Sequence, residues 1–232
     1  MDHDKKHVTV VGLPFSENEN SNFEISNNVC WVQNREGDIV HRIPVNHYGL
    51  IGDYSNGLVA CRNVDAISFS IFEDPMLRTR PDTLYHYDAV KNIITPCFTI
   101  DYVVSENQSA CTVLYETSRS YWAQVTLYPN NLSSSVSSVR LPAFNVCVSK
   151  KDDNVRRIDR FTDSLLGLSY PYLVMQNGYV CISYEPLELM DALDKVLTQT
   201  DLEPDVRKRA TDLRNSLHEN DNDILIIGKL KQ

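Results

Sequence analysis

Two short groups of side chains have types and spacings that could support chemistry. The stretch "YHYD", from Tyr85 to Asp88, places a histidine two residues before a carboxylate. In a strand these two lie on one face and the tyrosines on the other, so the histidine could be a base oriented by the carboxylate. The simpler interpretation is a solvent-facing histidine and an aspartate that begins a turn. His41, His47 and Asp53 offer metal ligands, but no typical metal-site spacing joins them. We therefore predict no catalytic residue, no metal site and no cofactor.

Binding is a better match to the residue types than catalysis. Aromatic side chains next to loops can stack on sugars or peptides, and a nearby guanidinium can add a charged contact. The candidate ligand-binding residues on this basis are Arg80, Tyr121, Trp122 and Tyr170. For Trp122, packing in the core is the competing interpretation.

The cysteines indicate packing rather than metal binding. The chain has 6 cysteines and no C-x-x-C pair, which argues against a zinc site and a thioredoxin-like site. Five of them lie in apolar or β-branched stretches and are expected to be free thiols in the core. They are Cys30, Cys97, Cys111, Cys147 and Cys181. The even number leaves disulfides open if the protein is exported.

The elements that must position these side chains are mostly strands. Short β-branched and aromatic runs extend from His7 to Tyr184, separated by Asn, Asp, Gly and Ser. Three hairpins are predicted, with the turns "NREGD", "DAVKN" and "PNNLS"; the last is followed by a strand from Val136 to Leu141. The turns are roughly 40 to 53 residues apart, which is the repeat of a four-stranded propeller blade. We predict an all-β, propeller-like array of antiparallel blades, about four in number.

Two helices interrupt the strands near the C-terminus. Pro186 and Pro204 stand where a first helical turn tolerates proline. The expected apolar stripes are Leu187, Met190, Leu193, Val196 and Leu197 in the first helix, and Val206, Ala210, Leu213 and Leu217 in the second. We assign 1–232 to a single domain, with a helical insert at 185–218 and a closing strand at 223–231. This strand should pair with the hairpin around "QNG", at 172–184.

Charge and hydropathy limit the kinds of partner and location that the sequence predicts. The net charge is −9 and the pI is about 5.1, so we predict no nucleic-acid partner. No apolar run reaches the length of about 18 residues that a membrane span needs. The first twenty residues have no apolar region of the kind that a secretory signal requires.

Two stretches resemble a known family. The run from "YVCISYEPLELMDAL" to "RKRATDLRNSLHENDNDILIIGKLK" resembles the C-terminal part of six-bladed β-propeller proteins of Bacteroidales. "DTLYHYDAVKNIITPCFTIDY" is similar to the blade motif of that family, in which a strand containing "D-T-[IL]-Y-x-Y-D" precedes one containing "x-P-x-F-x-[IV]-D". The resemblance covers the chain from about residue 57 onwards and implies a propeller fold, with no assigned catalytic or binding motif.

The function predicted from these observations is a non-enzymatic propeller module that binds a small molecule, glycan or protein. One alternative is a hydrolase or lyase with its site at the mouth of the propeller channel. Another is a truncated propeller without independent activity, which would self-associate to cover an exposed blade face. The resemblance implies the periplasm or the cell surface. The absence of a signal peptide in the sequence leaves a cytoplasmic or truncated protein as the alternative.

Overall fold

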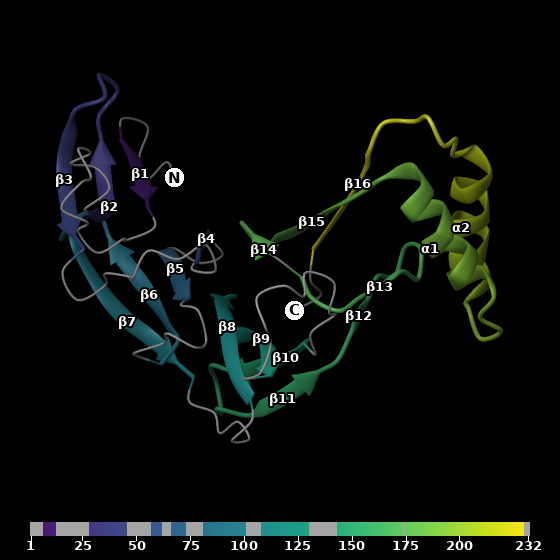
Figure 1. The fold of residues 1–232 in the computed structure, drawn as a ribbon, viewed down its shortest axis with the longest axis horizontal. Coiled ribbons are helices and arrows are strands. Elements are labelled where there is room, and N and C mark those ends of the chain that lie inside the picture. The colour runs from purple at the N-terminus through teal and green to yellow at the C-terminus, as the bar shows by residue number, and fades with distance from the viewer. Residues whose placement is uncertain are drawn as a thin grey trace. The chain divides into compact units, whose positions relative to one another are not determined.

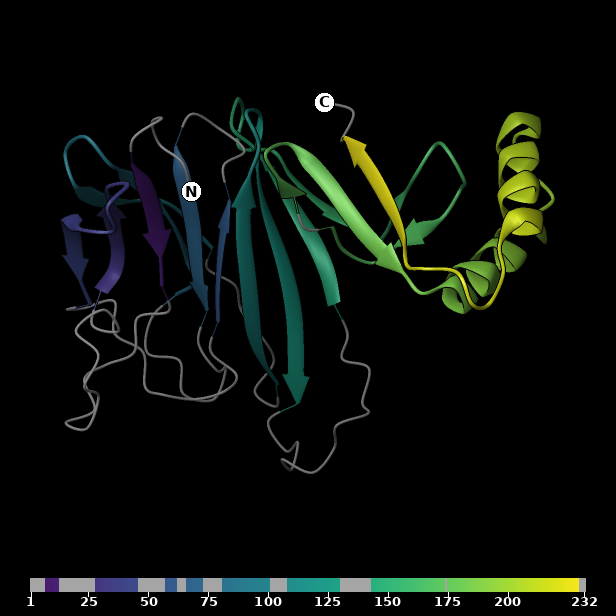
Figure 2. The same cartoon turned by 90° about the horizontal axis from the view of Figure 1, so that it is seen from above.

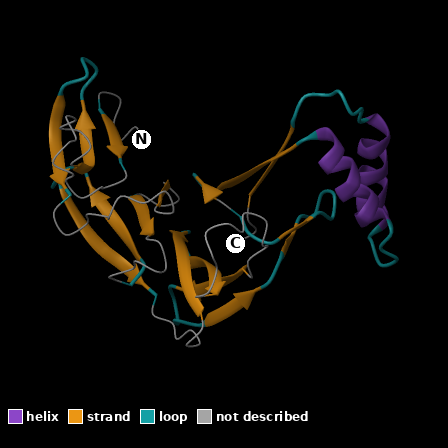
Figure 3. Ribbon diagram, viewed as in Figure 1, coloured by secondary structure: helices purple, strands orange, loops and turns teal. Residues whose placement is uncertain are grey.

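The structure, a computed structural model, is mostly β, with two helices late in the chain (Figures 1 and 3). It describes residues 7–12, 28–45, 57–61, 66–72, 81–100, 108–129, 143–173 and 175–229. Two compact units are present, Met1–Arg156 and Arg157–Gln232. Among the described residues, neither helix combines the length and hydropathy that crossing a membrane requires. The predicted all-β class is confirmed, since most of the described elements are strands in antiparallel sheets.

The first unit contains three antiparallel sheets in which neighbours in sequence are neighbours in space. Strands β1 (Val8–Val11), β2 (Asn28–Gln33) and β3 (Ile39–Pro44) form the first sheet. The second contains β4 (Gly57–Cys61), β5 (Ile67–Phe72), β6 (Thr83–Asp88) and β7 (Ile93–Thr99). The third contains β8 (Gln108–Glu116), β9 (Ser120–Pro129), β10 (Ala143–Ser149) and β11 (Val155–Ile158), of which β8 and β9 run side by side as long strands in Figure 2.

The turn residues explain two of the predicted hairpins. Between β2 and β3, Gly37 has a φ of 91°, which suits glycine. Between β6 and β7, the Oδ1 atom of Asp88 accepts hydrogen bonds from the backbone N–H groups of Val90 and Lys91, both at 3.0 Å. Asn92 completes that turn with a φ of 52°. Both hairpins, and the turn role of Asp88, are confirmed.

The second sheet has packing contacts on both faces. One face packs against the first sheet in a core that includes Val29, Cys30, Phe69 and Tyr87. The opposite face carries Leu84 and packs against apolar side chains of the third sheet. The alternation predicted for "YHYD" is confirmed, since Tyr85 and Tyr87 contact the first core while the intervening histidine is directed to the third sheet.

The contact between the second and third sheets is partly polar. Strand β8 lies at an edge of its sheet, where backbone N–H groups need partners from outside that sheet. The N–H of Leu114 in β8 donates to the hydroxyl of Ser70 in β5 at 3.1 Å. Ser70 is itself fully buried, so this bond satisfies two polar groups between the sheets.

The second unit begins with a small hairpin and continues to the helices. Strands β12 (Phe161–Thr162) and β13 (Ser169–Tyr170) pair with each other. Strands β14 (Met175–Gln176), β15 (Tyr179–Tyr184) and β16 (Ile224–Lys229) form a three-stranded sheet. Asn177 and Gly178 have positive φ angles of 54° and 76° and form the predicted "QNG" turn. The last strand pairs with β15, from Tyr179 opposite Lys229 to Tyr184 opposite Ile224, as expected.

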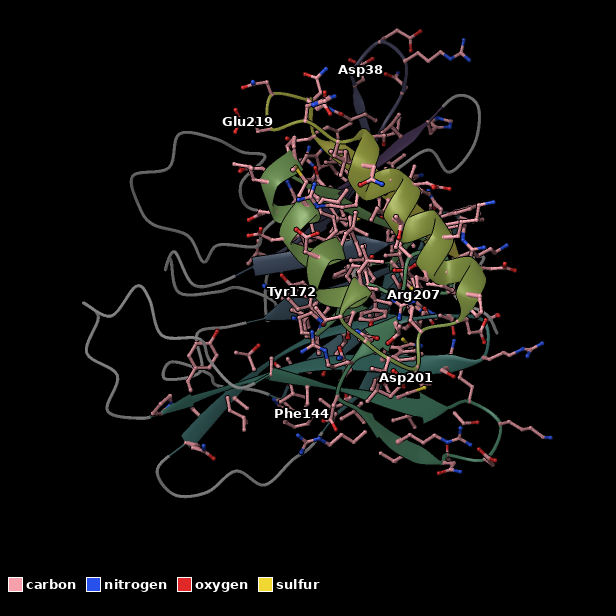
Figure 4. The ribbon with its side chains drawn as sticks, turned by 90° about the vertical axis from the view of Figure 1, so that its right-hand side faces the viewer. Asp38, Phe144, Tyr172, Asp201, Arg207 and Glu219 are labelled. Atoms are coloured by element: carbon pink, nitrogen blue, oxygen red, sulfur yellow. The ribbon has the colours of Figure 1, made fainter. Side chains whose placement is uncertain are left out.

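Helices α1 (Pro186–Leu197) and α2 (Pro204–Ser216) lie between β15 and β16, and each begins at the predicted proline. Figure 4 looks onto them, with Asp201 in their connection and Arg207 on α2. The guanidinium of Arg214 contacts both carboxylate oxygens of Asp194, at 2.8 and 3.0 Å. Hydrogen bonding to Arg214 lowers the pKa of Asp194.

Three expectations need correction. In α1 the buried positions include Leu189, whereas Leu187, placed in the expected stripe, is 55% exposed. Cys181 is exposed rather than in the core, because it lies on the outer face of β15; Cys30 is fully buried as expected. Strand β10 was not predicted, and the strand expected at 136–141 lies outside the described residues. The single domain over 1–232 stays a prediction.

Candidate functional site

The clearest polar cluster in the first unit is centred on Glu116. This residue ends β8, and its side chain is 0% exposed. Its Oε1 atom is hydrogen-bonded to Nε2 of His86 on β6, and its Oε2 atom accepts from Nζ of Lys150 at 2.5 Å. His86 and Lys150 are 30% and 23% exposed. The carboxylate therefore lies between two partly solvated cationic or polar groups, contributed by the second and third sheets.

The position of Lys150 follows from the turns at the edge of the third sheet. Lys150 comes directly after β10, and its backbone N–H donates to the carbonyl of Arg119 at 2.9 Å. Arg119 belongs to the β8–β9 turn, in which Thr117 and Ser120 exchange backbone and hydroxyl hydrogen bonds. The two adjacent turns thus hold the lysine beside the end of β8.

Cys97 reaches the same cluster through a β-bulge. On β7, Pro96 is opposite Tyr85 and Phe98 is opposite Leu84, so Cys97 is the extra residue. A bulge changes the direction in which side chains point, and here Cys97 and Phe98 both face the third sheet. A sulfur, a nitrogen and an oxygen from Cys97, His86 and Glu116 lie within 4.8 Å of one another.

Electrostatics in the cluster follow from burial and from these contacts. Burial alone would raise the pKa of Glu116, but hydrogen bonds from His86 and Lys150, and their charges, outweigh it and lower the pKa. Burial, and then the negative charge of Glu116, raises the pKa of Cys97 to about 12. Glu116 is therefore a carboxylate at neutral pH, and Cys97 is a thiol.

Tyr121, one of the predicted ligand-binding residues, lies next to this cluster. Its ring stacks on Phe98 with a centroid distance of 4.5 Å, and Nζ of Lys150 lies 4.5 Å from the same ring centroid. Trp122, the next residue on β9, is 8% exposed and stacks on Tyr115 at 6.1 Å. The core packing considered for Trp122 is confirmed. Arg80 lies outside the described residues.

A shallow basic pocket of about 740 Å³ lies beside the cluster, at the turns of the third sheet. Its cations include Arg119, Lys150 and Lys151, and serine hydroxyls line the space between them. Arg119 and Lys151 are exposed, and the structure records no ion pair for either within its described part. This edge is therefore positively charged in a chain with a net charge of −9.

The second unit contains an apolar pocket of about 440 Å³. It lies between the β12–β13 hairpin and the inner face of the β14–β16 sheet. Tyr170, another predicted ligand-binding residue, lines it. The remaining lining residues are mostly apolar, with a few polar groups: Phe161, Thr162, Asp163, Ser164, Leu165, Leu173, Val180, Ile182, Ile226, Ile227, Gly228 and Lys229.

Asp163 organises one wall of this pocket. Its carboxylate accepts hydrogen bonds from the backbone N–H groups of Leu165, Leu166 and Leu168, at 2.6 to 2.9 Å. It also accepts from the hydroxyl of Tyr170 at 3.3 Å. Burial, and then the negative charge of Asp163, raises the pKa of Tyr170 well above its usual range, so the phenol stays neutral. The carboxylate of Asp163 thus accepts four hydrogen bonds, which hold the loop and Tyr170 in place.

The prediction of site residues from the sequence was therefore incomplete. Tyr121 and Tyr170 each border a candidate site, one in each unit. The central residues Glu116, Cys97 and Lys150 were not proposed as site residues. His86 was considered only with Asp88, and its simpler interpretation as a solvent-facing histidine is wrong, because its Nε2 is hydrogen-bonded to the buried carboxylate of Glu116. No protein-family model, curated protein or solved structure matches the chain.

Proposed function

We propose that this chain is a non-enzymatic binding module, built of propeller-type blades, that takes a small amphipathic ligand in the pocket of its second unit. The observation that carries the proposal is the pocket lined by Tyr170. Its volume of about 440 Å³ falls in the range of about 300 to 1,000 Å³ that small-molecule sites occupy. An apolar lining with a few polar groups is typical of such sites.

The lining also indicates the chemistry of the ligand. Phe161, Leu173 and Ile182 would contact an apolar body. Asp163 already accepts four hydrogen bonds, so it is not positioned to bind a cation. Lys229 borders the pocket at the end of β16, but its Nζ lies 5.6 Å from the ring centroid of Tyr179, on the outer face of the sheet. The polar groups that face the ligand are therefore neutral hydroxyls, such as that of Thr162. The proposed ligand class is therefore a compact aromatic or aliphatic molecule with few polar groups.

Other features support the wider proposal. The sheets β4–β7 and β8–β11 are four-stranded antiparallel meanders, which is the strand order of a propeller blade. The resemblance to the Bacteroidales family suggests the periplasm or the cell surface as the location. Neither observation bears on the ligand itself, for which the pocket is the basis.

The binding proposal is tested by titrating the full chain with anilinonaphthalene sulfonate, which has an aromatic body and an anionic head. We expect saturable binding of one molecule, detected by fluorescence. Lys229→Gln should leave the affinity unchanged, because the ammonium of Lys229 lies over the Tyr179 ring on the outer face of the sheet. Lys195→Gln, on the exposed side of α1, removes a charge far along the chain from the pocket residues and should also bind as the parent does.

Exposed apolar side chains outside the pocket, such as Leu225, could also bind the dye, so a second variant distinguishes the pocket from the surface. Ile182→Phe fills the pocket and should abolish the saturable phase, with the far-ultraviolet circular dichroism of the parent retained. If the phase persists in Ile182→Phe, or if the parent shows none, the proposed pocket function is wrong.

A further inference from the structure

The cluster around Glu116 has a property that ligand binding in the other unit does not explain. Three different donor atoms converge there: a histidine nitrogen, a cysteine sulfur and a carboxylate oxygen, all within 4.8 Å of one another. His86 and Glu116 stand at paired positions of β6 and β8, and Cys97 is the bulge residue between the paired Pro96 and Phe98 of β7. A site built on strands is positioned more firmly than one built on loops.

We propose that His86, Cys97 and Glu116 bind a zinc ion. Zinc is a borderline-soft cation that accepts nitrogen, sulfur and oxygen ligands. Hard cations such as calcium and magnesium take oxygen ligands and are poorly matched to this set. Three protein ligands leave a fourth tetrahedral position for water or an exogenous ligand.

Binding requires only side-chain movements. Zinc–ligand bonds of about 2.0 to 2.3 Å place tetrahedral donor atoms about 3.5 Å apart. Oε1 of Glu116 and Nε2 of His86 must separate from their present hydrogen bond to admit the ion. Sγ of Cys97 must move about 1 Å closer, starting from the upper separation of 4.8 Å. The ion replaces the His86–Glu116 hydrogen bond, and the thiol of Cys97 releases its proton to solvent without any change of oxidation state.

Lys150 is a positioning residue for this site. Its Nζ donates to Oε2 of Glu116, which leaves Oε1 directed at His86 and available to the metal. A hydrogen bond from a neighbouring group commonly fixes the orientation of a metal-binding carboxylate. The positive charge of Lys150 opposes the ion, however, so removing the charge while retaining a hydrogen-bond donor should strengthen metal binding.

The first test uses cobalt(II) as a spectroscopic probe on the full chain, reduced and freed of metal with a chelator. We expect one equivalent of cobalt to produce a thiolate-to-metal charge-transfer absorption, which zinc then removes by displacement. Cys97→Ser should lose this absorption. Cys181→Ser, at an exposed cysteine of the second unit, should keep it. A parent protein without the absorption, or an absorption that depends on Cys181 and not on Cys97, would overturn the proposal.

The second test measures zinc affinity by competition with a chromophoric chelator. His86→Ala should weaken binding by at least about 100-fold, since loss of an outer-shell partner alone costs about 10- to 100-fold. Lys150→Gln should tighten binding about tenfold through relief of charge repulsion. Lys151→Gln, the adjacent exposed lysine, should leave the affinity unchanged. Weaker binding in Lys150→Gln than in Lys151→Gln would contradict the assigned role of Lys150, and equal affinity of His86→Ala and the parent would refute the site.

Discussion

Gly167 provides a sharp test of the packing in the second unit, because two separate effects oppose any side chain there. It lies in the loop between β12 and β13, with a φ of 74°. A Cβ atom at this position would lie 3.0 Å from Cδ1 of Leu202, 3.2 Å from Cγ1 of Val196 and 3.3 Å from Cγ1 of Val206. The loop therefore approaches side chains of α1, α2 and their connection so closely that an added methyl group would have to displace them by a few tenths of an ångström.

The cost of Gly167→Ala follows from these two effects. A non-glycine residue in the left-handed region costs about 1 kcal/mol. Overpacking against three side chains adds about 1 to 3 kcal/mol. We expect the free energy of unfolding to fall by about 2 to 4 kcal/mol. Gly178→Ala is the matched control, since its φ is 76° but nothing lies within 4 Å of the added methyl group. That variant should lose only about 1 kcal/mol.

The assay is urea unfolding followed by the helical circular dichroism signal. Both described helices belong to the second unit, so this signal reports on the unit that contains the two glycines. Equal destabilisation by the two substitutions would show that backbone conformation alone accounts for the effect. The close approach of the loop to the helices would then be refuted.

Three further predictions concern burial and charge. Leu189→Ala should lower the free energy of unfolding, followed by the helical signal, by about 2 to 5 kcal/mol. Leu187→Ala should lower it by less than about 0.5 kcal/mol, because only Leu189 is fully buried. Similar values for the two variants in urea titrations would contradict the assigned face of α1. Asp163→Ala should cost about 2 to 3 kcal/mol in the same assay, since it leaves buried N–H groups without an acceptor; a change below about 0.5 kcal/mol would refute this role. In metal-free protein, Glu116→Gln should cost about 2 kcal/mol at neutral pH, measured by tryptophan fluorescence. Because the pKa of Glu116 is lowered in the folded protein, the stabilisation is present above the unfolded value of about 4.3 and is lost as the pH falls through the folded value. The difference between the two proteins should therefore shrink as the pH is lowered below the unfolded value, and a pH-independent difference would contradict this prediction.

Local patterns in the sequence were sufficient for much of the fold. Turn residues with defined conformational preferences mark the hairpins at Gly37, Asp88 and Gly178, and prolines mark the start of both helices. The pairing of β16 with β15 across the helices followed from the need to cover a sheet edge. These features depend on neighbouring residues or on one simple physical requirement.

The candidate sites depend on contacts between distant residues, and for this reason they were harder to predict. His86 was considered with Asp88, two residues away, but its partner Glu116 is 30 residues further along the chain. Two local signals were nevertheless present. Pro96 cannot donate a ladder hydrogen bond, so inside a strand it indicates an edge or a bulge, and both are found there. Glu116 ends an apolar strand, where a carboxylate needs partners.

Stability alone does not account for the arrangement around Glu116. Burying a carboxylate costs free energy that its partners must offset, and well-packed apolar residues of similar volume often stabilise a protein as much or more. An ion-paired carboxylate is therefore an inefficient means of holding the second and third sheets together. The bulge at Cys97 adds a thiol to the same point, which the ion pair does not require. A bound metal gives each of these groups a role: Glu116, His86 and Cys97 supply its ligands, and Lys150 orients the carboxylate.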